Sequence, residues 1–301
     1  MKILLLGSNG VIGNGISLSL KKYKLIKVNS SSYNYNKDKY ILHKFPKCDF
    51  FVHAAGITEE EIKKKGPKKS LKRAGKATDE LLNHLAKLGC KNIIYISSLR
   101  LYSEKAITLE EEKTKLQIDD SYKLCHFKTE NIFKKIAKKN EIKFLILRPG
   151  AVYGFPKNKY KLNRLKLIPY SFPISLYKDD KILLKSSGNQ MRNFCSNKDI
   201  GKRVYKWFKN KNKKNTLSNI SGDKTCSVKD FSFICTRIFK KIFKKKGVVN
   251  IPFKFSKNSR KRGLVVKQKI NIKNIDNLEN FLKNFFLLLK KNKIILKGLR
   301  N

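Results

Sequence analysis

The chain has 301 residues, of which 41% are apolar, enough to bury a sizeable core in one large domain or in one domain with a smaller lobe. No apolar run reaches the roughly 18 residues that span a bilayer, and the apolar stretch after Lys2 lacks a signal-peptide cleavage site. Six scattered cysteines form no CxxC pair. We therefore expect a cytoplasmic protein without a metal site. The net charge of +48 would suit a nucleic-acid partner, but the excess is mainly lysine spread along the whole chain, which argues against a specific one.

The first residues form a short apolar strand, Ile3–Leu6, that runs directly into three glycines with the spacing Gly7-x-x-Gly10-x-x-Gly13. Such a turn brings backbone N–H groups against the pyrophosphate of a dinucleotide, and the helix that follows adds the positive end of its dipole. Gly7 can take a positive φ, and Gly13 lets the helix pack closely on the strand. The residues expected to contact the cofactor here are Gly7, Asn9, Gly10, Val11, Ile12 and Gly13.

Strand and helix patterns alternate through the first half of the chain. The predicted strands are Ile3–Leu6, Lys24–Val28, Phe50–His53, Asn92–Ile96 and Phe144–Leu147, and the predicted helices are Gly13–Lys22, Thr78–Leu88 and Tyr122–Lys138. This alternation is typical of an α/β protein with a Rossmann-type, doubly wound parallel sheet, in which ligands bind at the carboxyl ends of the strands.

The alternation stops after Gly154, where a lysine-rich segment with three prolines, Phe155–Gly188, predicts a lobe or lid. Beyond it the predicted helices are Asp199–Lys209, Ser227–Lys241 and Asp276–Lys290, and the predicted loop is Lys241–Arg262. We therefore expect a dinucleotide-binding domain at residues 1–154, to which residues 190–222 return. A smaller C-terminal, substrate-binding lobe is expected at residues 155–189 and 223–301.

Two hydroxyl side chains lie where such a sheet presents groups to its cofactor. Ser98 follows the strand Asn92–Ile96, and Tyr122 opens a predicted helix further along the chain. A tyrosine beside a nicotinamide can exchange a proton with a substrate oxygen, and a serine hydroxyl can hold the same oxygen. Either residue alone is more often a packing residue, so their pairing is a hypothesis that other motifs must support.

Those motifs occur in one order along nearly the whole chain. They are His53-Ala54-Ala55-Gly56, Ser97-Ser98-Leu99-Arg100-Leu101-Tyr102, Glu130 after Tyr122, Leu147-Arg148-Pro149-Gly150-Ala151-Val152-Tyr153-Gly154, Arg192-Asn193-Phe194 followed by Asp199, and Asn219-Ile220-Ser221-Gly222 followed by Ser227-Val228. Together with the glycine turn, this series resembles the extended short-chain dehydrogenases/reductases of the NAD-dependent epimerase/dehydratase family, whose members act on nucleotide sugars.

The resemblance implies a role for each matching residue. The implied catalytic residues are Ser98, Tyr122 and His126, the last at the position of the family's lysine. Outside the glycine turn, the implied cofactor contacts are His53, Ala54, Ala55, Gly56, Tyr122 and Pro149. The implied substrate contacts are Ser98, Arg100, Tyr153 and Arg192, with Arg192 on the nucleotide phosphates. The resemblance also implies a nucleotide-sugar substrate, a homodimer and a place in the synthesis of polysaccharide precursors.

The chain departs from the family at the residue four positions after the tyrosine. By resemblance, a lysine in the pattern Tyr-x-x-x-Lys lowers the tyrosine pKa and bonds the nicotinamide ribose, but here the residue is His126. A neutral histidine can bond a ribose hydroxyl but carries little charge at pH 7. Two interpretations stay open: a protonated His126 replaces the lysine, or the chain is a catalytically impaired dinucleotide-binding protein.

The second departure concerns the choice of cofactor. Proteins of this fold that prefer NAD carry an acidic residue after the second strand, which holds the ribose 2′-hydroxyl. Here Asn29 and Ser30 follow Val28, and no carboxylate occurs before Asp38. We therefore expect Asn29 and Ser30 to contact the cofactor, which is NADP or NAD with NADP slightly preferred.

The third departure concerns the chemistry. Leu99 and Arg100 follow Ser98, where by resemblance the members that eliminate water or carbon dioxide carry a carboxylate. Dehydratase and decarboxylase chemistry is therefore not expected. The sequence predicts an NAD(P)-dependent nucleotide-sugar 4-epimerase or 4-keto-sugar reductase, in which Tyr122 is the acid and base.

Overall fold

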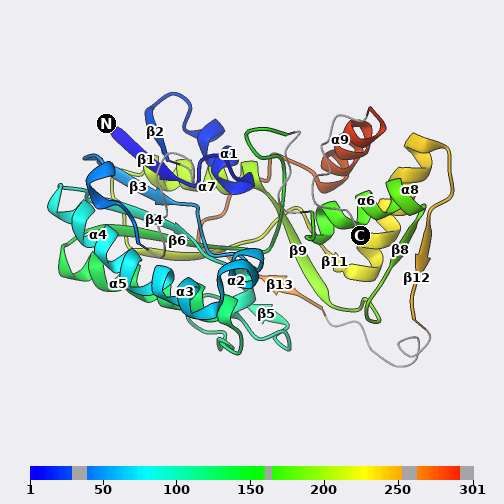
Figure 1. The fold of residues 1–301 in the computed structure, drawn as a ribbon, viewed down its shortest axis with the longest axis horizontal. Coiled ribbons are helices and arrows are strands. Elements are labelled where there is room, and N and C mark those ends of the chain that lie inside the picture. Colours follow the sequence, from blue (N-terminus) through cyan, green and yellow to red (C-terminus); the bar gives the residue numbers. More distant parts are fainter. Residues whose placement is uncertain (29–38, 160–164, 253–262, 292–301) are drawn as a thin grey trace.

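A six-stranded, fully parallel sheet lies at the centre of one half of the molecule (Figure 1). The protein is described by a computed structural model over residues 1–28, 39–159, 165–252 and 263–291. The strands of this sheet lie in the order β10-β6-β4-β3-β1-β2. Their bounds are Lys2–Leu6 (β1), Lys24–Val28 (β2), Phe50–His53 (β3), Asn92–Ile96 (β4), Lys143–Pro149 (β6) and Thr216–Ile220 (β10).

The sheet connections change direction at β1, which pairs with β2 on one side and with β3 on the other. Leu6 accordingly has both Val28 and His53 as register partners. A change of this kind leaves a crevice at the carboxyl ends of the two central strands, where ligands bind in this class of fold. The glycine turn after β1 and the segment 54–56 after β3 border this crevice.

Helices cover both faces of the sheet. The helical elements of this half are α1 (Val11–Ser19), η1 (Leu42–Lys44), α2 (Glu59–Lys65), α3 (Pro67–Lys72), the π-helical turn η2 (Arg73–Ala77), α4 (Thr78–Lys87), η3 (Leu99–Leu101), α5 (Ser121–Lys139) and α7 (Asn197–Lys209). A short pair of strands, β5 (Thr108–Leu109) and β13 (Val265–Val266), lies beside them.

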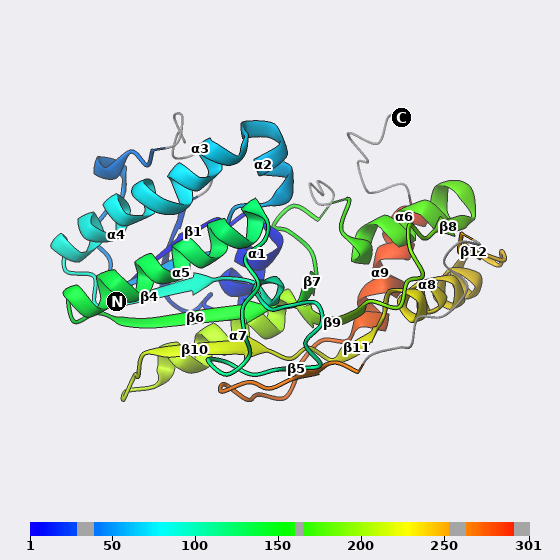
Figure 2. The same cartoon turned by 90° about the horizontal axis from the view of Figure 1, so that it is seen from below.

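Alternate residues of the strands point to opposite faces of the sheet. Ile3 and Leu5 are buried with residues of α1 and α7, whereas Leu4 and Leu6 are buried with residues of α4 and α5. Figure 2 shows α4 and α5 together on one face. The helices α1 and α7 cross very closely, because a Cβ on Gly15 would lie 2.0 Å from a carbonyl oxygen of α7.

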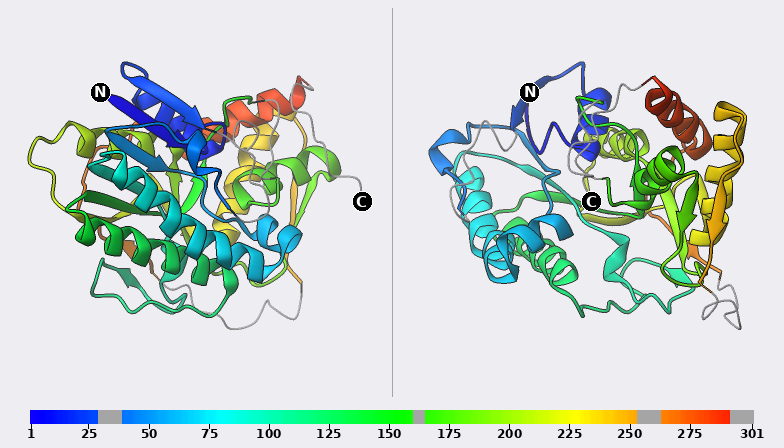
Figure 3. Two further views of the ribbon diagram at one scale, coloured as in Figure 1. Left: turned by 60° about the vertical axis from the view of Figure 1, so that its left-hand side comes forward. Right: turned by 45° about the vertical axis from the view of Figure 1, so that its right-hand side comes forward.

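The second half of the molecule lies beyond the carboxyl ends of the parallel strands (Figure 3). It contains a three-stranded sheet in the order β11-β9-β7 and a two-stranded sheet of β8 and β12. Its elements are β7 (Ala151–Tyr153), α6 (Ile168–Asp179), β8 (Lys181–Leu183), β9 (Met191–Ser196), β11 (Lys224–Ser227), α8 (Val228–Phe243), β12 (Val248–Asn250) and α9 (Leu278–Lys290).

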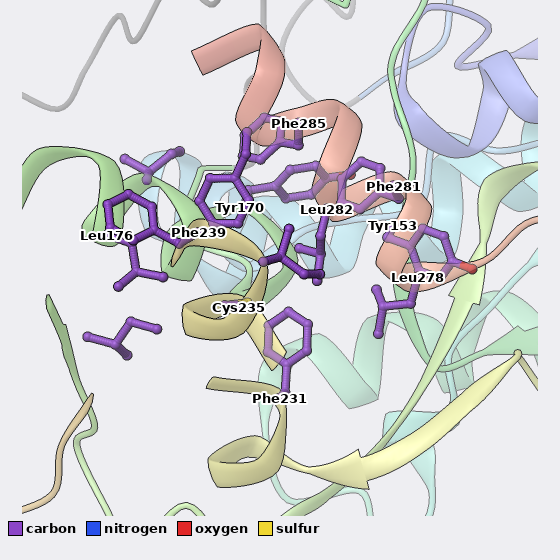
Figure 4. Close-up of a cluster of buried hydrophobic side chains, with 14 of the residues drawn as sticks. Tyr153, Tyr170, Leu176, Phe231, Cys235, Phe239, Leu278, Phe281, Leu282 and Phe285 are labelled. Atoms are coloured by element: carbon purple, nitrogen blue, oxygen red, sulfur yellow. The ribbon is translucent and has the colours of Figure 1, made fainter. Parts of the chain in front are cut away.

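Aromatic side chains from three helices fill the core of this second half (Figure 4). Phe281 and Phe285 of α9 stack with their ring centroids 5.8 Å apart, and both contact Tyr170 of α6 edge-on. Phe231 and Phe239 of α8 lie in the same cluster. Phe281 also contacts Tyr153 of β7, and Phe231 stacks on Phe194 of β9, so these helices pack against the three-stranded sheet of the lobe.

The structure confirms the predicted Rossmann-type parallel sheet. The strands Lys24–Val28, Phe50–His53 and Asn92–Ile96 have the bounds that the sequence predicts. Helix α1 begins two residues before the predicted start at Gly13, because Gly10 is its N-cap. The alternation of strands and helices also resumes after Gly154, since β9, α7 and β10 follow one another and β10 joins the parallel sheet.

Two helical regions differ from the prediction. Residues 59–77 form α2, α3 and η2, although their lysine-rich sequence has no clear helical period of apolar residues. Helix α6 contains Pro169 in its first turn, where proline is tolerated, and Pro173 in its interior. The predicted loop Lys241–Arg262 is shorter, because α8 extends to Phe243 and β12 covers residues 248–250, and residues 253–262 lie outside the described residues.

Candidate functional site

The turn after β1 requires glycine at two positions. Gly7 has a φ of +88°, and a Cβ there would lie 2.8 Å from the carbonyl carbon of Ala54. A Cβ on Gly13 would lie 2.1 Å from the carbonyl oxygen of Gly7. Both distances are too short for any side chain, so the turn brings β1, β3 and α1 closer together than other residues would allow.

The start of α1 suits a negatively charged ligand. Gly10 is its N-cap and supplies no side-chain hydrogen bond, and the first turn contains no acidic residue. The first N–H groups of a helix have no intrahelical partner and carry partial positive charge. The turn Gly7–Gly13 therefore fits the pyrophosphate of a nicotinamide dinucleotide.

The segment after β7 lies against this turn. The backbone N–H of Lys157 donates to the carbonyl oxygen of Asn9 at 3.3 Å. Asn14 donates from Nδ2 to the carbonyl oxygen of Phe155 at 3.0 Å, and Asn197 donates to that of Val11 at 2.7 Å. The sequence motifs did not single out these two asparagines. They connect the segment that leads into the second half of the molecule with the proposed cofactor site.

His53 ends β3 as a buried side chain, with its Nε2 3.2 Å from the Tyr40 hydroxyl. Burial, together with the nearby charge of Arg73, lowers the pKa of His53 to about 3. The ring is therefore neutral at physiological pH and is suited to packing, not to proton transfer. Ala54, Ala55 and Gly56 continue from it along the crevice.

The two residues predicted after β2, Asn29 and Ser30, lie outside the described residues. Val28 is the last described residue before them, and its carbonyl oxygen accepts hydrogen bonds from the N–H groups of Gly7 and Ser8, at 2.8 and 3.3 Å. The end of β2 is thus fixed beside the glycine turn, where a dinucleotide ribose binds in this fold.

Ser98 lies just beyond the carboxyl end of β4. Its side-chain oxygen accepts a hydrogen bond from the backbone N–H of Arg100 at 3.2 Å and so caps the short helix η3. The neighbouring Ser97 hydroxyl is buried without a hydrogen-bond partner among the described residues. This cap fixes the backbone position from which the Arg100 side chain extends.

Tyr122 is the second residue of α5, whose N-cap is Asp120. The guanidinium carbon of Arg100 lies 4.4 Å from the centre of the Tyr122 ring, and the His126 ring lies 4.5 Å from it. The structure thus brings the Ser98 segment, Tyr122 and His126 together at one place.

His126 is buried, and both of its ring nitrogens lie next to protein groups. Nε2 lies 3.2 Å from the carbonyl oxygen of Ile57, and Nδ1 lies 2.6 Å from the Tyr95 hydroxyl. A Cβ on Gly56 would lie 3.0 Å from Cε1 of the ring. Since a carbonyl can only accept, Nε2 donates to Ile57, and this geometry directs the ring into the protein and not toward a ribose.

Two carboxylates that the motifs did not indicate also reach this place. Arg100 forms ion pairs with Glu59 of α2 and with Asp120, the latter at 3.3 Å. The local signal for α2 is Thr58, which accepts a hydrogen bond from the N–H of Glu61 at 3.1 Å as an N-cap. That signal predicts a helix start but not its contact with Arg100.

Behind these residues, Glu130 and Arg148 form a buried ion pair with two hydrogen bonds, of 2.9 and 2.7 Å. Burial disfavours the charged form of Arg148 and by itself would lower its pKa. The bonds to Glu130 outweigh this effect, so the pKa of Arg148 is raised. Arg148 also donates to the Tyr102 hydroxyl at 2.8 Å, and Tyr102 donates to Asn219 at 2.9 Å. The motif residues Glu130, Arg148 and Tyr102 thus join α5, β6 and β10, next to the buried Pro149.

The two predicted substrate residues from the second half have different surroundings. Tyr153 is fully buried and donates its hydroxyl to Asp223 at 2.6 Å, which favours a packing role. Arg192, on β9, is 39% exposed and lies 3.6 Å from Glu104 in a loose ion pair. Arg192 therefore has the access to solvent that contact with a nucleotide phosphate requires.

Neither a metal-binding cluster nor a membrane-spanning helix occurs in the parts of the chain that the structure describes. No cluster of three or more histidine, cysteine or acidic side chains is arranged to hold a metal ion there. No helix in those parts has the length and apolar character needed to cross a membrane.

A family model described as the NAD dependent epimerase/dehydratase family matches residues 3–221. A search of curated proteins found no match. Solved structures with the same fold include a UDP-glucuronic acid 4-epimerase from Bacillus cereus in complex with UDP-glucuronic acid and NAD, which is 18% identical, with a TM-score of 0.76 over 97% of this chain and 100% of that one. A UDP-glucose 4-epimerase with UDP-glucose from Thermotoga maritima is 17% identical, with a TM-score of 0.77 over 97% and 99%. A UDP-N-acetylglucosamine 4-epimerase from Methanobrevibacter ruminantium is 14% identical, with a TM-score of 0.75 over 97% and 98%.

Proposed function

Because the chain belongs to the NAD-dependent epimerase/dehydratase family, as its motifs predicted, we propose that it is a nicotinamide-dependent enzyme that epimerises C4 of a nucleotide sugar or reduces a 4-keto sugar. The observation that carries this proposal is the position of the Arg100 guanidinium over the Tyr122 ring. Arg100 lies two residues after Ser98, so this contact brings the proposed acid/base and its hydroxyl partner to the same end of the sheet. The structural relatives named above are 4-epimerases of UDP-sugars, which supports the same reaction class.

A nicotinamide dinucleotide held at this site would supply the hydride chemistry at C4 of the sugar. The glycine turn binds its pyrophosphate through backbone N–H groups. Tyr122 exchanges a proton with the oxygen on C4, and the Ser98 hydroxyl holds that oxygen in place. Arg192 contacts the phosphates of the nucleotide sugar.

The surroundings of Tyr122 support epimerase or reductase chemistry over elimination. Elimination of water would need a further acid or base beside the sugar, and the carboxylates of Glu59 and Asp120 are instead ion-paired with Arg100. We also propose that NADP is used slightly better than NAD, because no carboxylate occurs between Val28 and Asp38, although several relatives were crystallised with NAD. A cytoplasmic homodimer is part of the same proposal.

One observation favours a second candidate, a dinucleotide-binding protein with impaired catalysis. His126 stands at the family's lysine position, and both of its nitrogens face protein groups. A side chain in that position cannot also bond a nicotinamide ribose without moving. The two candidates share the cofactor site and differ only in turnover.

Calorimetric titration with NADP(H) and NAD(H), at a salt concentration that screens the basic surface, tests the shared part of the proposal. Micromolar binding of one dinucleotide is the expected result, and absence of binding for both would contradict the two candidates together. Nucleotide sugars are then screened for exchange at C4 and for reduction of 4-keto derivatives. Turnover supports the enzyme, and binding without turnover supports the impaired protein.

A further inference from the structure

Tyr122 needs a nearby positive charge if it is to exchange protons near neutral pH, since a phenol ordinarily ionises near pH 10. The family's lysine would supply this charge, but His126 occupies its position and bonds Ile57 and Tyr95. Lys123, the next residue of α5, pairs with Asp119 at 2.6 Å. The charge must therefore come from another element if the proposed function holds.

Several groups with charged or titratable side chains face Tyr122. From α5 itself comes His126, from β4 comes Tyr95, and from η3 comes Arg100. Glu59 of α2 and Asp120 before α5 reach the same place through their ion pairs with Arg100. Of these groups, the guanidinium of Arg100 is a permanent cation.

The geometry of Arg100 suits a role in stabilising negative charge on Tyr122. A guanidinium donates hydrogen bonds in its own plane and stacks through its face. The bonds to Glu59 and Asp120 come from the nitrogens of the group, whereas its central carbon lies over the Tyr122 ring, 4.4 Å from the ring centre. The ion pairs therefore hold the cation over the ring.

We propose that Arg100 supplies the positive charge that stabilises the Tyr122 phenolate, and so takes over the electrostatic half of the function of the missing lysine. This inference rests on the proposed function, in which Tyr122 is the acid and base. Glu59 and Asp120 act as positioning residues, because they hold the guanidinium in place. They also offset part of its charge, so the removal of Arg100 and the removal of Glu59 should have opposite effects.

The ionisation of Tyr122 can be measured directly in the protein without substrate or cofactor. Tyrosine labelled with 13C at Cζ gives a signal that shifts when the phenol ionises, and Tyr122→Phe identifies the signal of Tyr122. We expect Arg100→Met to raise the midpoint of this titration by about half a pH unit or more. Arg100→Lys, which keeps the charge, should restore part of the shift, and Glu59→Gln should lower the midpoint.

Arg237 provides a matched control, because it is also about half exposed and ion-paired, with Glu279, but lies on α8. Arg237→Met removes the same unit of charge and should leave the midpoint within about 0.1 unit, since salt screens distant charges. Equal midpoints in Arg100→Met and Arg237→Met would overturn the inference, as would a Tyr122 signal that does not titrate in either variant before the protein unfolds.

The result also separates this inference from the proposed function. A protein that turns over no nucleotide sugar but shows the shift in Arg100→Met loses the proposed function and keeps the Arg100–Tyr122 coupling. An active enzyme without the shift keeps the function and loses the inference. Where activity is found, the pH at which kcat/KM reaches half its plateau should rise in Arg100→Met in parallel with the titration.

Discussion

The hydroxyl of Tyr95 lies 2.6 Å from Nδ1 of His126 inside the protein, and this bond joins β4 to α5 directly behind Tyr122. Because Nε2 of the same ring donates to the carbonyl oxygen of Ile57, Nδ1 of the neutral ring accepts from the Tyr95 hydroxyl. The histidine thus connects three elements, β4, α5 and the segment after β3, at the position where the family carries a lysine.

Tyr95→Phe removes the donor to Nδ1 and leaves that nitrogen buried without its partner. We expect the free energy of unfolding to fall by about 1–3 kcal/mol, the usual cost of an unsatisfied buried group. Urea denaturation at pH 7 measures the change. Tyr23→Phe is the control, because Tyr23 is only partly buried and should lose less than about 0.5 kcal/mol.

His126→Lys restores the family's residue and distinguishes the two candidate functions. If Arg100 already supplies the charge, a lysine at this buried position loses the bond to Tyr95 and adds a cation to the interior, so both stability and turnover should fall. The fall in stability is expected to be about 1–3 kcal/mol. A large gain in turnover would instead show that the native chain has lost its catalytic lysine, and initial rates with the preferred nucleotide sugar measure the difference.

Sequence patterns gave a good prediction of the parallel sheet, because strands such as Phe50–His53 are short apolar runs that end at glycine or serine turns. They did not predict α2 and α3, because residues 59–72 are mostly charged and lack a clear helical period of apolar residues, although the N-cap Thr58 is a local signal for the start of α2. The family motifs indicated Ser98 and Tyr122, and their catalytic roles stay a prediction. The ion pair between Glu59 and Arg100 was not predicted, since it joins residues far apart in sequence that meet only after folding.

Gly7→Ala tests the close approach in the glycine turn. Gly7 and Gly66 have nearly the same φ, +88° and +86°, but a Cβ on Gly7 would meet Ala54 at 2.8 Å, whereas one on Gly66 would meet no atom within 4 Å. Gly66→Ala should therefore cost only the backbone strain, about 1–3 kcal/mol, and keep dinucleotide binding. Gly7→Ala should cost more and weaken binding at least about tenfold, because β1 and β3 must separate. Equal affinities in the two variants would contradict a pyrophosphate site at this turn.

Arg148→Met breaks the buried ion pair behind the site and leaves Glu130 without its cation. The loss of a partner from such a pair costs about 3–5 kcal/mol, and a marginally stable domain loses much of its stability at this cost. Arg237→Met breaks the exposed pair with Glu279 and should cost less than about 1 kcal/mol. Thermal and urea unfolding of the two variants measure the contrast, and similar losses would show that the Glu130–Arg148 pair does not stabilise the fold.

The buried ring of His53 predicts how stability depends on pH. Its pKa is about 3 in the folded protein, against 6.5 ordinarily, because burial disfavours the charged form. Below pH 6.5 the unfolded chain therefore takes up a proton that the folded protein does not, so this group contributes full stability above pH 6.5 and loses it as the pH falls toward 3. At pH 5 the loss amounts to about 2 kcal/mol relative to pH 7.5.

The substitution His53→Asn removes the titrating group. Between pH 7.5 and pH 5, the unfolding free energy of this variant should therefore fall by that much less than the unfolding free energy of the native protein. The slope with pH is the informative quantity, because the loss of ring packing lowers stability equally at every pH. An unchanged slope in His53→Asn would mean that the His53 ring accepts a proton in the folded protein. The burial of the ring beside Tyr40 and within β3 argues against that result.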